Sequence, residues 1–226
     1  MKVVILAGGL GTRMSEYTKT IPKPMVKIGK KPILEHIMDH YYSYGFKDFC
    51  IAGGYKIEAI EKFIKKKTFK YNVQLIFTGK NTLTGGRLKR LKKYIDTENF
   101  FLTYGDGLSD VNINKLLSFH LKHKKTATVT AVHPVARFGE LKIKKNLVVK
   151  FKEKPQVTKG WINGGFFVFN KKIFNYIKDD KTILEKEPLE SLSKKNRLVA
   201  FKHNGFWQCV DTKRERDTLH EIWKNK

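Results

Sequence analysis

Short apolar runs alternate with helical patterns through the first 134 residues. Continuous apolar runs that stop at glycine or proline are typical of buried strands, and they fall at 2–8, 48–54, 72–79, 99–107 and 126–134. Between them, apolar residues recur every three or four positions, as on one face of a helix, over 31–45, 56–66, 87–95 and 110–123. This β-α-β-α order predicts an α/β fold: a doubly wound, mostly parallel mixed sheet with helices on both faces.

The pattern changes in the second half of the chain. Residues 139–155 read as two short apolar strands around a Lys-Lys-Asn turn, which predicts an antiparallel pair. After this pair the sequence predicts a strand at 161–170, helices at 171–177 and 185–195, a final hairpin over 196–211 and a closing helix at 212–223. No repeat or low-complexity linker interrupts the chain. We therefore expect residues 1–226 to form a single domain, in which the second half adds a small β-rich lobe.

Composition narrows the classes of function. The chain has 226 residues, of which 41% are hydrophobic and 12% aromatic, enough for a folded core. It has no apolar run of membrane-spanning length and no signal-peptide pattern at its start, and its two cysteines lie far apart. These features favour a cytoplasmic protein with reduced thiols and no membrane partner.

The net charge of +25 fits either a lysine-covered surface or a polyphosphate substrate. The lysines are spread along the chain and few of them are interleaved with aromatic residues. A nucleic-acid groove would combine the two, so the pattern argues against a nucleic-acid partner.

The loop after the first strand carries three glycines, Gly8, Gly9 and Gly11. They stand at the edge of a parallel sheet where ligands bind, and glycine lets the backbone approach an anion and present N–H groups to it. A dinucleotide-binding loop needs a further glycine at the position of Met14, and no Gly-Lys-Ser/Thr follows to make a Walker-type phosphate loop. The loop therefore predicts phosphate binding of another kind.

Two cations follow this loop. Arg13 offers planar bidentate contact to phosphate oxygens, and Lys23 offers a compact positive charge. Pro22 and Pro24 restrict the backbone on either side of Lys23, which lowers the entropy lost when it holds a substrate. Fixed cations beside a glycine loop suit phosphate chemistry, so Arg13 and Lys23 are the predicted catalytic residues. The alternative is a glycine-rich turn with surface cations.

Two carboxylates follow predicted strands. Asp106 stands between two glycines after the strand at 99–107, and Asp211 follows the last predicted strand. Carboxylates at such an edge, next to phosphates, are suitable ligands for Mg²⁺, so Asp106 and Asp211 are the predicted metal ligands. The alternatives are a tight turn for Asp106 and a helix N-cap for Asp211.

A second glycine pair, Gly85 and Gly86, stands before the helix predicted at 87–95, and Arg87 lies in its first turn. A helix N-terminus with a flexible lead-in binds anions or contacts a base through its main chain. His120 and His123 share another predicted helix without a third ligand, and we interpret both as surface residues. No catalytic triad is predicted.

Two further stretches carry polar residues suited to a phosphorylated sugar. Glu153 and Lys154 precede a proline; a glutamate accepts hydrogen bonds from hydroxyl groups and a lysine binds phosphate. Asn163 precedes Gly164 and Gly165, where the backbone lets a ligand approach closely. Ordinary turn chemistry is the alternative for both stretches.

The motif "LAGGLGTRM" followed by "PKPM" resembles the sugar-1-phosphate nucleotidyltransferase family, which joins a sugar 1-phosphate to a nucleoside triphosphate. Within it, "TLTGGRLKR", "TYGDGLSD", "VTAVHPVARFGEL", "GWINGGFFVF", "EKEPLESL" and "GFWQCVDT" are similar to the glucose-1-phosphate cytidylyltransferases. The resemblance covers nearly the whole chain, with its motifs in the same order.

The resemblance implies roles for individual residues, and it implies a Rossmann-like nucleotidyltransferase fold whose small β-rich lobe binds the sugar. The nucleotide would contact Leu6, Ala7, Gly8, Gly9, Gly11, Thr12, Arg13, Lys23, Thr82, Arg87 and Gly105. The sugar phosphate would contact Glu153, Lys154, Asn163 and Gly165. Asp106 and Asp211 would hold Mg²⁺ as the cofactor.

The implied reaction is transfer of a cytidylyl group from CTP to glucose 1-phosphate, giving CDP-glucose and pyrophosphate. It belongs to nucleotide-sugar synthesis for lipopolysaccharide or capsule. The partners are small molecules, and the alternative is another base, such as that of UTP or dTTP, or another phosphorylated substrate. A shortened segment near residues 64–77 is unusual for the family and leaves a homo-oligomer open. Cys209 stands where proline is more usual, close to Asp211.

Overall fold

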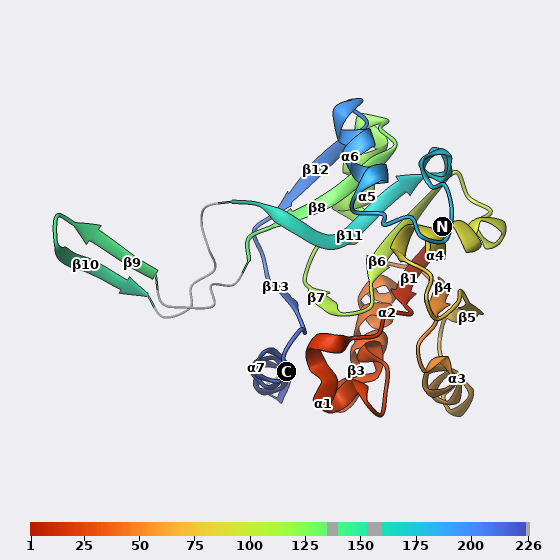
Figure 1. Cartoon of the computed structure of the whole chain (residues 1–226), viewed down its shortest axis with the longest axis horizontal. Coiled ribbons are helices and arrows are strands. Elements are labelled where there is room, and N and C mark those ends of the chain that lie inside the picture. Colours follow the sequence, from red (N-terminus) through yellow and green to blue (C-terminus); the bar gives the residue numbers. More distant parts are fainter. Residues whose placement is uncertain (135–139, 153–159, 225–226) are drawn as a thin grey trace.

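The computed structural model describes residues 1–134, 140–152 and 160–224. At its centre is a seven-stranded sheet with the order β12-β8-β11-β6-β1-β4-β5 (Figure 1). Its strands are β1 (Lys2–Ala7), β4 (Asp48–Gly53), β5 (Asn72–Phe77), β6 (Asn99–Tyr104), β8 (Ala127–Val132), β11 (Ile162–Asn170) and β12 (Leu198–His203). Only β11 runs antiparallel to its neighbours, β6 and β8, while the other pairs are parallel. The predicted mostly parallel mixed sheet is confirmed.

Helices cover both faces of this sheet. One face packs against α2 (Ile33–Ser43), α3 (Ile57–Lys66), α5 (Ile113–His123) and α7 (Lys213–Lys224). The other face packs against α4 (Thr84–Arg90), α6 (Glu187–Lys194) and the 3-10 turns η3 (Lys92–Tyr94) and η4 (Lys171–Tyr176). Two core clusters result because successive residues of a buried strand point to opposite faces. The doubly wound arrangement is thereby confirmed.

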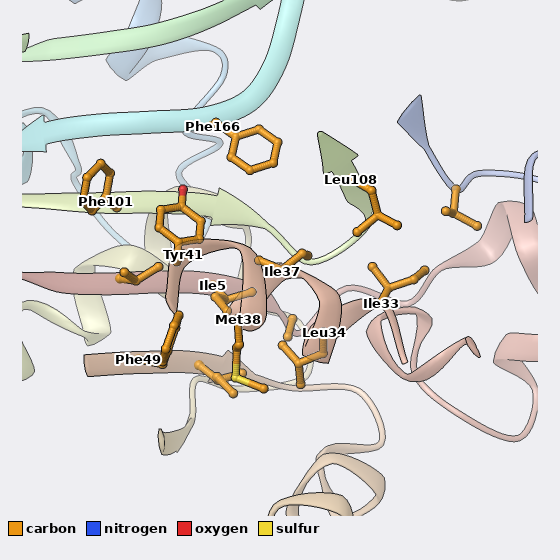
Figure 2. Packing of buried hydrophobic residues seen from close by; sticks show 14 of the residues in the cluster. Ile5, Ile33, Leu34, Ile37, Met38, Tyr41, Phe49, Phe101, Leu108 and Phe166 are labelled. Carbon is orange, nitrogen blue, oxygen red and sulfur yellow. The ribbon is translucent and has the colours of Figure 1, made fainter. Parts of the chain in front are cut away.

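The packing of α2 shows how the sequence pattern produces the larger cluster. Its apolar residues at three- and four-residue spacing include Ile33, Ile37 and Tyr41, all at most 2% exposed. Figure 2 shows this stripe lying against side chains from the sheet, among them Ile5 of β1 and Phe101 of β6. The aromatic rings of Tyr41 and Phe101 meet edge to face, with centroids 5.3 Å apart.

Within the residues that the structure describes, three short strand pairs lie outside the main sheet. They are β2 (Lys27–Ile28) with β3 (Lys31–Pro32), β7 (Gly107–Ser109) with β13 (Trp207–Cys209), and β9 (Glu140–Lys144) with β10 (Leu147–Lys152). The β9–β10 pair is antiparallel, as predicted for 139–155. The hairpin predicted over 196–211 is wrong, because β12 pairs with β8 and β13 pairs with β7. The apolar runs identified both strands, but the partner of a strand depends on distant residues.

Two predicted helices differ from the structure. The helix predicted at 87–95 begins earlier, at Thr84, and gives way to a 3-10 turn after Arg90, and the segment 171–177 is a 3-10 helix. The glycines of α4 do not lead into the helix but lie inside its first turn. A Cβ on Gly86 would lie 2.5 Å from the Cα and carbonyl oxygen of Asp180, so glycine is needed there for close packing.

The N-terminal N–H groups of α4 are also occupied. Those of Gly85 and Gly86 both donate to the carbonyl of Thr182. These two N–H groups are therefore occupied within the protein, and contact of this segment with a nucleotide stays a prediction. None of the helices that the structure describes is long and apolar enough to cross a bilayer.

The interpretation of His120 as a surface residue is wrong. The side chain is 2% exposed, because His120 follows Ile113 by seven positions and so lies on the buried stripe of α5. Its Nε2 lies 3.2 Å from Asn99 Oδ1, and its Nδ1 lies 2.9 Å from Thr128 Oγ1. Because an amide oxygen only accepts, Nε2 carries the proton and Nδ1 accepts from the hydroxyl. His123, on the same helix, is exposed as expected.

This histidine predicts a pH dependence of stability. Burial lowers the pKa of His120 to about 4, whereas an exposed histidine in the unfolded chain titrates near 6.5. The unfolded chain therefore binds a proton that the folded chain does not, and the free energy of unfolding falls as pH falls from 6.5 towards 4. We expect wild type to lose about 2 kcal/mol more than His120→Gln between pH 7 and pH 5, measured by urea unfolding. Equal losses in the two proteins would contradict this assignment.

Candidate active site

A cavity of about 680 Å³ opens at the carboxyl ends of β1 and β6, where ligands bind in open α/β sheets. Its lining comes from five regions: the end of β1 with the glycine loop, the turn that carries Lys23, the segment leading into and including the start of α4, the end of β6, and the segment before α6. The residues are Leu6, Ala7, Gly8, Gly9, Leu10, Gly11, Thr12, Lys23, Pro24, Lys80, Asn81, Thr82, Leu83, Thr84, Arg87, Tyr104, Gly105, Asp106 and Glu185. The structure thus brings together all of the residues predicted to contact the nucleotide except Arg13, whose side chain lies outside the described part of the chain.

The glycine loop turns sharply between β1 and the 3-10 turn η1 (Thr12–Met14). Gly11 has a φ of +63°, in the left-handed region that favours glycine. A Cβ at this position would lie 2.8 Å from the side chain of Thr18 and 3.2 Å from Cβ of Lys23. Gly11 therefore lets the loop close over the segment that carries Lys23.

Lys23 is held at the start of the 3-10 turn η2 (Lys23–Met25). Pro22 precedes this turn and Pro24 lies within it, which fixes the backbone φ on either side of the lysine. The residue is only 8% exposed. Its ammonium nitrogen Nζ lies 2.7 Å from Asp106 Oδ2 and 2.5 Å from Asp211 Oδ1. The three charged residues singled out from distant parts of the sequence therefore meet at one point.

The β7–β13 ladder explains how the two carboxylates meet. Asp106 directly precedes β7, and only Val210 separates Asp211 from the end of β13. Because the two strands are antiparallel, with Gly107 opposite Cys209, the start of one lies beside the end of the other. The N–H of Val210 donates to the carbonyl of Asp106 at 2.9 Å, which extends the pairing to the carboxylates.

The helix N-cap predicted as an alternative for Asp211 is filled by its neighbour. Thr212 Oγ1 accepts from the N–H of Glu215, and the Glu215 carboxylate accepts from the N–H groups of Asp211 and Thr212. This reciprocal capping box satisfies backbone N–H groups at the start of α7 without the Asp211 side chain. The Asp211 carboxylate instead bonds to Lys23 and accepts a long contact of 3.6 Å from Cys209 Sγ.

The charges of this cluster favour a protonated lysine. Burial lowers the pKa of Lys23, but the adjacent Asp106 and Asp211 raise it by more, so the net shift is upward. The pKa of Cys209 is raised to about 12, first by burial and then by Asp211 and Asp106, so this thiol stays neutral.

The same cluster has the chemistry of a magnesium site. Mg²⁺ is usually held by one or two carboxylates together with substrate phosphates, and Asp106 and Asp211 supply two carboxylates that already converge on a cation. The ammonium of Lys23 stands in for that cation. No group of three or more histidine, cysteine or acidic side chains suited to a metal occurs within the described ranges, so the substrate would have to complete the site.

Arg87 has a different environment from Lys23. It is 4% exposed, and its guanidinium donates to backbone carbonyls of the glycine loop and of the segment before α4. Nη2 donates to Gly8 O at 2.8 Å and to Lys80 O at 3.1 Å, and Nη1 donates to Gly79 O at 2.7 Å and Thr78 Oγ1 at 2.9 Å. Arg87 therefore fixes the glycine loop relative to the segment before α4. A direct contact with the nucleotide stays a prediction.

The residues predicted for the sugar phosphate are only partly within the described structure. Glu153 and Lys154 lie outside it. Asn163 and Gly165 lie on β11, next to β6, and Gly165 has a φ of +77°. Asn163 Oδ1 accepts from the N–H of Gly165 at 2.8 Å, and its Nδ2 donates to the hydroxyl of Tyr104 at 3.1 Å. Their contact with a sugar is not tested and remains a prediction.

The sequence did not point to Tyr104, Thr84 or Glu185, which also line the cavity. Tyr104 and Thr84 stand next to predicted site residues, so proximity in the sequence was an available signal. Glu185 lies in the motif "EKEPLESL", which contributed to the family resemblance but did not imply a role for this residue. No local pattern shows that a carboxylate before α6 lies beside residues about a hundred positions earlier.

Comparison with known proteins gives a consistent picture. The family profile described as nucleotidyl transferase matches residues 2–214. The chain is similar to the glucose-1-phosphate cytidylyltransferases of Salmonella typhimurium and Salmonella typhi, with 45% identity to each over 247 aligned positions that cover 99% of this chain and 96% of each relative. It is also similar to the solved structure of HddC from Yersinia pseudotuberculosis complexed with GMP-PN, with 29% identity, a TM-score of 0.78, and coverage of 98% of this chain and 99% of the other.

Proposed function

The chain belongs to the nucleotidyl transferase family, and from this premise we propose that it transfers a cytidylyl group from CTP to glucose 1-phosphate, giving CDP-glucose and pyrophosphate. The observation that carries the proposal is the 45% identity to glucose-1-phosphate cytidylyltransferases over 99% of this chain and 96% of the relatives. The cavity is lined by the glycine loop, Lys23 and Asp106, and Asp211 is bonded to Lys23, which together have the chemistry that such a reaction needs.

The reaction is an in-line substitution at phosphorus. A phosphate oxygen of glucose 1-phosphate forms a bond to the α-phosphorus of CTP, and the bond from that phosphorus to the bridging oxygen breaks. The electron pair of the broken bond leaves with pyrophosphate. Because the nucleophile is already an anion, no general base is required. The protein has to bring two polyanions together and stabilise the charge of the transition state.

The residues of this chain are suited to those tasks. The glycine loop presents main-chain N–H groups to phosphate oxygens, and Arg87 holds that loop in place from behind. Lys23 supplies a buried positive charge whose backbone position is fixed by the flanking prolines. We assign Arg13 the same electrostatic role as Lys23.

We further propose that Asp106 and Asp211 hold Mg²⁺ when the substrates bind. When bound, the ion would neutralise phosphate charge and stabilise the leaving pyrophosphate. The convergence of the two carboxylates on the Lys23 ammonium supports this proposal. We also propose a cytoplasmic location, in keeping with the two unpaired thiols, and a place in lipopolysaccharide or capsule synthesis.

A substrate panel tests the proposed function. The full chain is incubated with Mg²⁺ and CTP, UTP, dTTP, ATP or GTP, each combined with glucose 1-phosphate and with other hexose 1-phosphates, and pyrophosphate release is measured. We expect kcat/KM to be highest for CTP with glucose 1-phosphate. Strong turnover with UTP or dTTP alone would contradict the cytidylyl assignment. Turnover with another phosphorylated substrate alone would contradict the glucose assignment.

A further inference from the structure

Glu185 is an acidic residue in the wall of a cavity proposed to bind two polyanions. It lies just before α6 and is half-buried. Its Oε1 accepts from the Tyr104 hydroxyl at 2.6 Å, and its Oε2 accepts from the Thr84 hydroxyl at 2.6 Å. The N–H of Leu184 donates to the Thr84 hydroxyl in turn, so this hydroxyl is fixed between the backbone and the carboxylate.

The Tyr104 hydroxyl belongs to a directed chain of hydrogen bonds. It accepts from Asn163 Nδ2 at 3.1 Å and donates to Glu185. The direction is fixed, because the Asn163 amide oxygen is already occupied by the N–H of Gly165. A carboxylate only accepts, so the phenol is the donor in the 2.6 Å hydrogen bond to Glu185.

The Glu185 carboxylate retains capacity to accept hydrogen bonds from a ligand. An ionised carboxylate offers about four lone-pair positions, and Tyr104 and Thr84 use two of them. Within the described residues, no lysine or arginine forms an ion pair with Glu185. A carboxylate without a cationic partner repels phosphate groups but accepts well from neutral hydroxyl groups. The carboxylate therefore favours an uncharged hydrogen-bond donor of the ligand, such as a hydroxyl group, over a phosphate.

The place of Tyr104 in the sheet indicates which hydroxyl groups these are. Tyr104 ends β6, which lies between β1, the strand of the glycine loop, and β11, the strand of Asn163. Glu185 therefore lies between Thr84 at the start of α4 and Tyr104 of β6, and Tyr104 links it to Asn163 of β11. A nucleotide with its phosphates on the glycine loop leaves the β11 side for the second substrate.

We propose that Glu185 is a specificity-determining residue that accepts a hydrogen bond from a hydroxyl group of the hexose in glucose 1-phosphate, held in position by Tyr104 and Thr84. This inference rests on the proposed function, and it adds a residue that recognises the sugar to those predicted from the sequence. A hydrogen bond to a charged acceptor, lost from an otherwise intact site, corresponds to about a 10- to 100-fold change in binding or rate.

The test compares Glu185→Gln with Glu187→Gln in the full chain. Glutamine keeps the size of the side chain and one acceptor oxygen. Glu187 is a matched control because it lies two residues away, is exposed, and pairs with Lys178 outside the cavity. For Glu185→Gln we expect kcat/KM for glucose 1-phosphate to fall about 10- to 100-fold, mainly through KM, with KM for CTP changed less than about twofold. Glu187→Gln should match wild type in all these values.

A series of deoxyglucose 1-phosphates distinguishes recognition from a merely structural role. Wild type should discriminate at least about 10-fold against the analogue that lacks the recognised hydroxyl, and Glu185→Gln should lose that discrimination while retaining it at other positions. Equal losses on every analogue would overturn the proposal. A changed preference between CTP and dCTP would also overturn it, because it would place the ribose at Glu185.

Two further arms keep the proposal testable. If Glu185→Gln does not fold, Tyr104→Phe removes one of the two donors and should shift the same discrimination in the same direction by a smaller factor. If wild type releases pyrophosphate with a different hexose 1-phosphate only, the proposed substrate fails. The deoxy series of that other sugar then tests Glu185 separately.

Discussion

Lys23→Ala is expected to lower kcat for pyrophosphate release by at least about 10²- to 10³-fold, the usual effect of removing one charge-stabilising group from a preorganised site. The ammonium is buried and lies within 2.7 Å of two carboxylates, so the fold has fixed its position before any substrate binds. A positive charge held in the cavity by the fold can stabilise the negative charge that develops on the transferred phosphate. Lys23→Arg should not restore activity, because a planar guanidinium does not fit the space of a compact ammonium.

The control for this prediction is Lys27→Ala. Lys27 lies four residues along the chain and is exposed, so the same loss of charge outside the cavity should leave kcat within about twofold. Urea unfolding should accompany the kinetics, because removing Lys23 leaves two carboxylates facing each other and lowers stability. Near-normal turnover by a folded Lys23→Ala protein would refute the assignment.

A binding measurement separates the role of Lys23 in the metal site from its role in the reaction. The ammonium and the proposed divalent ion use the same two carboxylates. Without nucleotide, Lys23→Ala should therefore bind Mn²⁺ more tightly than wild type, as measured by electron paramagnetic resonance. Weaker binding would mean that Lys23 only holds the two carboxylates in place.

The part of the site that the sequence predicted depends on a general property of parallel sheets. The glycine loop follows β1 and Asp106 follows β6, and the carboxyl ends of these neighbouring parallel strands meet at one edge of the sheet, so position alone predicted that the two lie close together. The same property placed the glycine loop correctly. For these residues, the local sequence was enough to predict the position in the sheet.

The rest depended on contacts between distant segments. Asp211 reaches Asp106 because β13 pairs with β7, whereas the local pattern indicated a hairpin within 196–211. Arginine is a residue type that often binds phosphate, yet the guanidinium of Arg87 donates to backbone carbonyls of the protein itself. The partner of a strand or of a side chain is determined by packing across the sheet, and it cannot be predicted from residue type and spacing alone.

His120 shows the opposite case, in which the signal was present in the sequence. Its spacing from Ile113 and Leu116 already placed it on the apolar stripe of α5. The lack of a third metal ligand says nothing about burial, whereas the helical period does. A polar residue on a buried stripe predicts hydrogen-bonding partners in the core, which Asn99 and Thr128 supply.

Asp106→Asn and Asp211→Asn are each expected to lower kcat by at least about 10²- to 10³-fold. Asparagine keeps the shape of the side chain and an oxygen that accepts from Lys23, so the change removes charge with little effect on packing. Because both carboxylates act on the same cation, the double variant should lose much less than the product of the two single losses. Pyrophosphate release at increasing Mg²⁺ concentration gives the rates and the apparent affinity for the ion.

The control for the carboxylates is Asp110→Asn. Asp110 follows Asp106 by four residues, is exposed, and pairs with His203 at 2.9 Å outside the cavity, so its loss should change neither kcat nor the Mg²⁺ dependence. For Asp106→Asn and Asp211→Asn, higher Mg²⁺ should recover part of the lost rate, because a weakened site fills at higher concentration. A reduced rate with an unchanged Mg²⁺ dependence would assign the two carboxylates to holding Lys23 and not the ion. Fully multiplicative losses in the double variant would show that the two carboxylates do not share one cation.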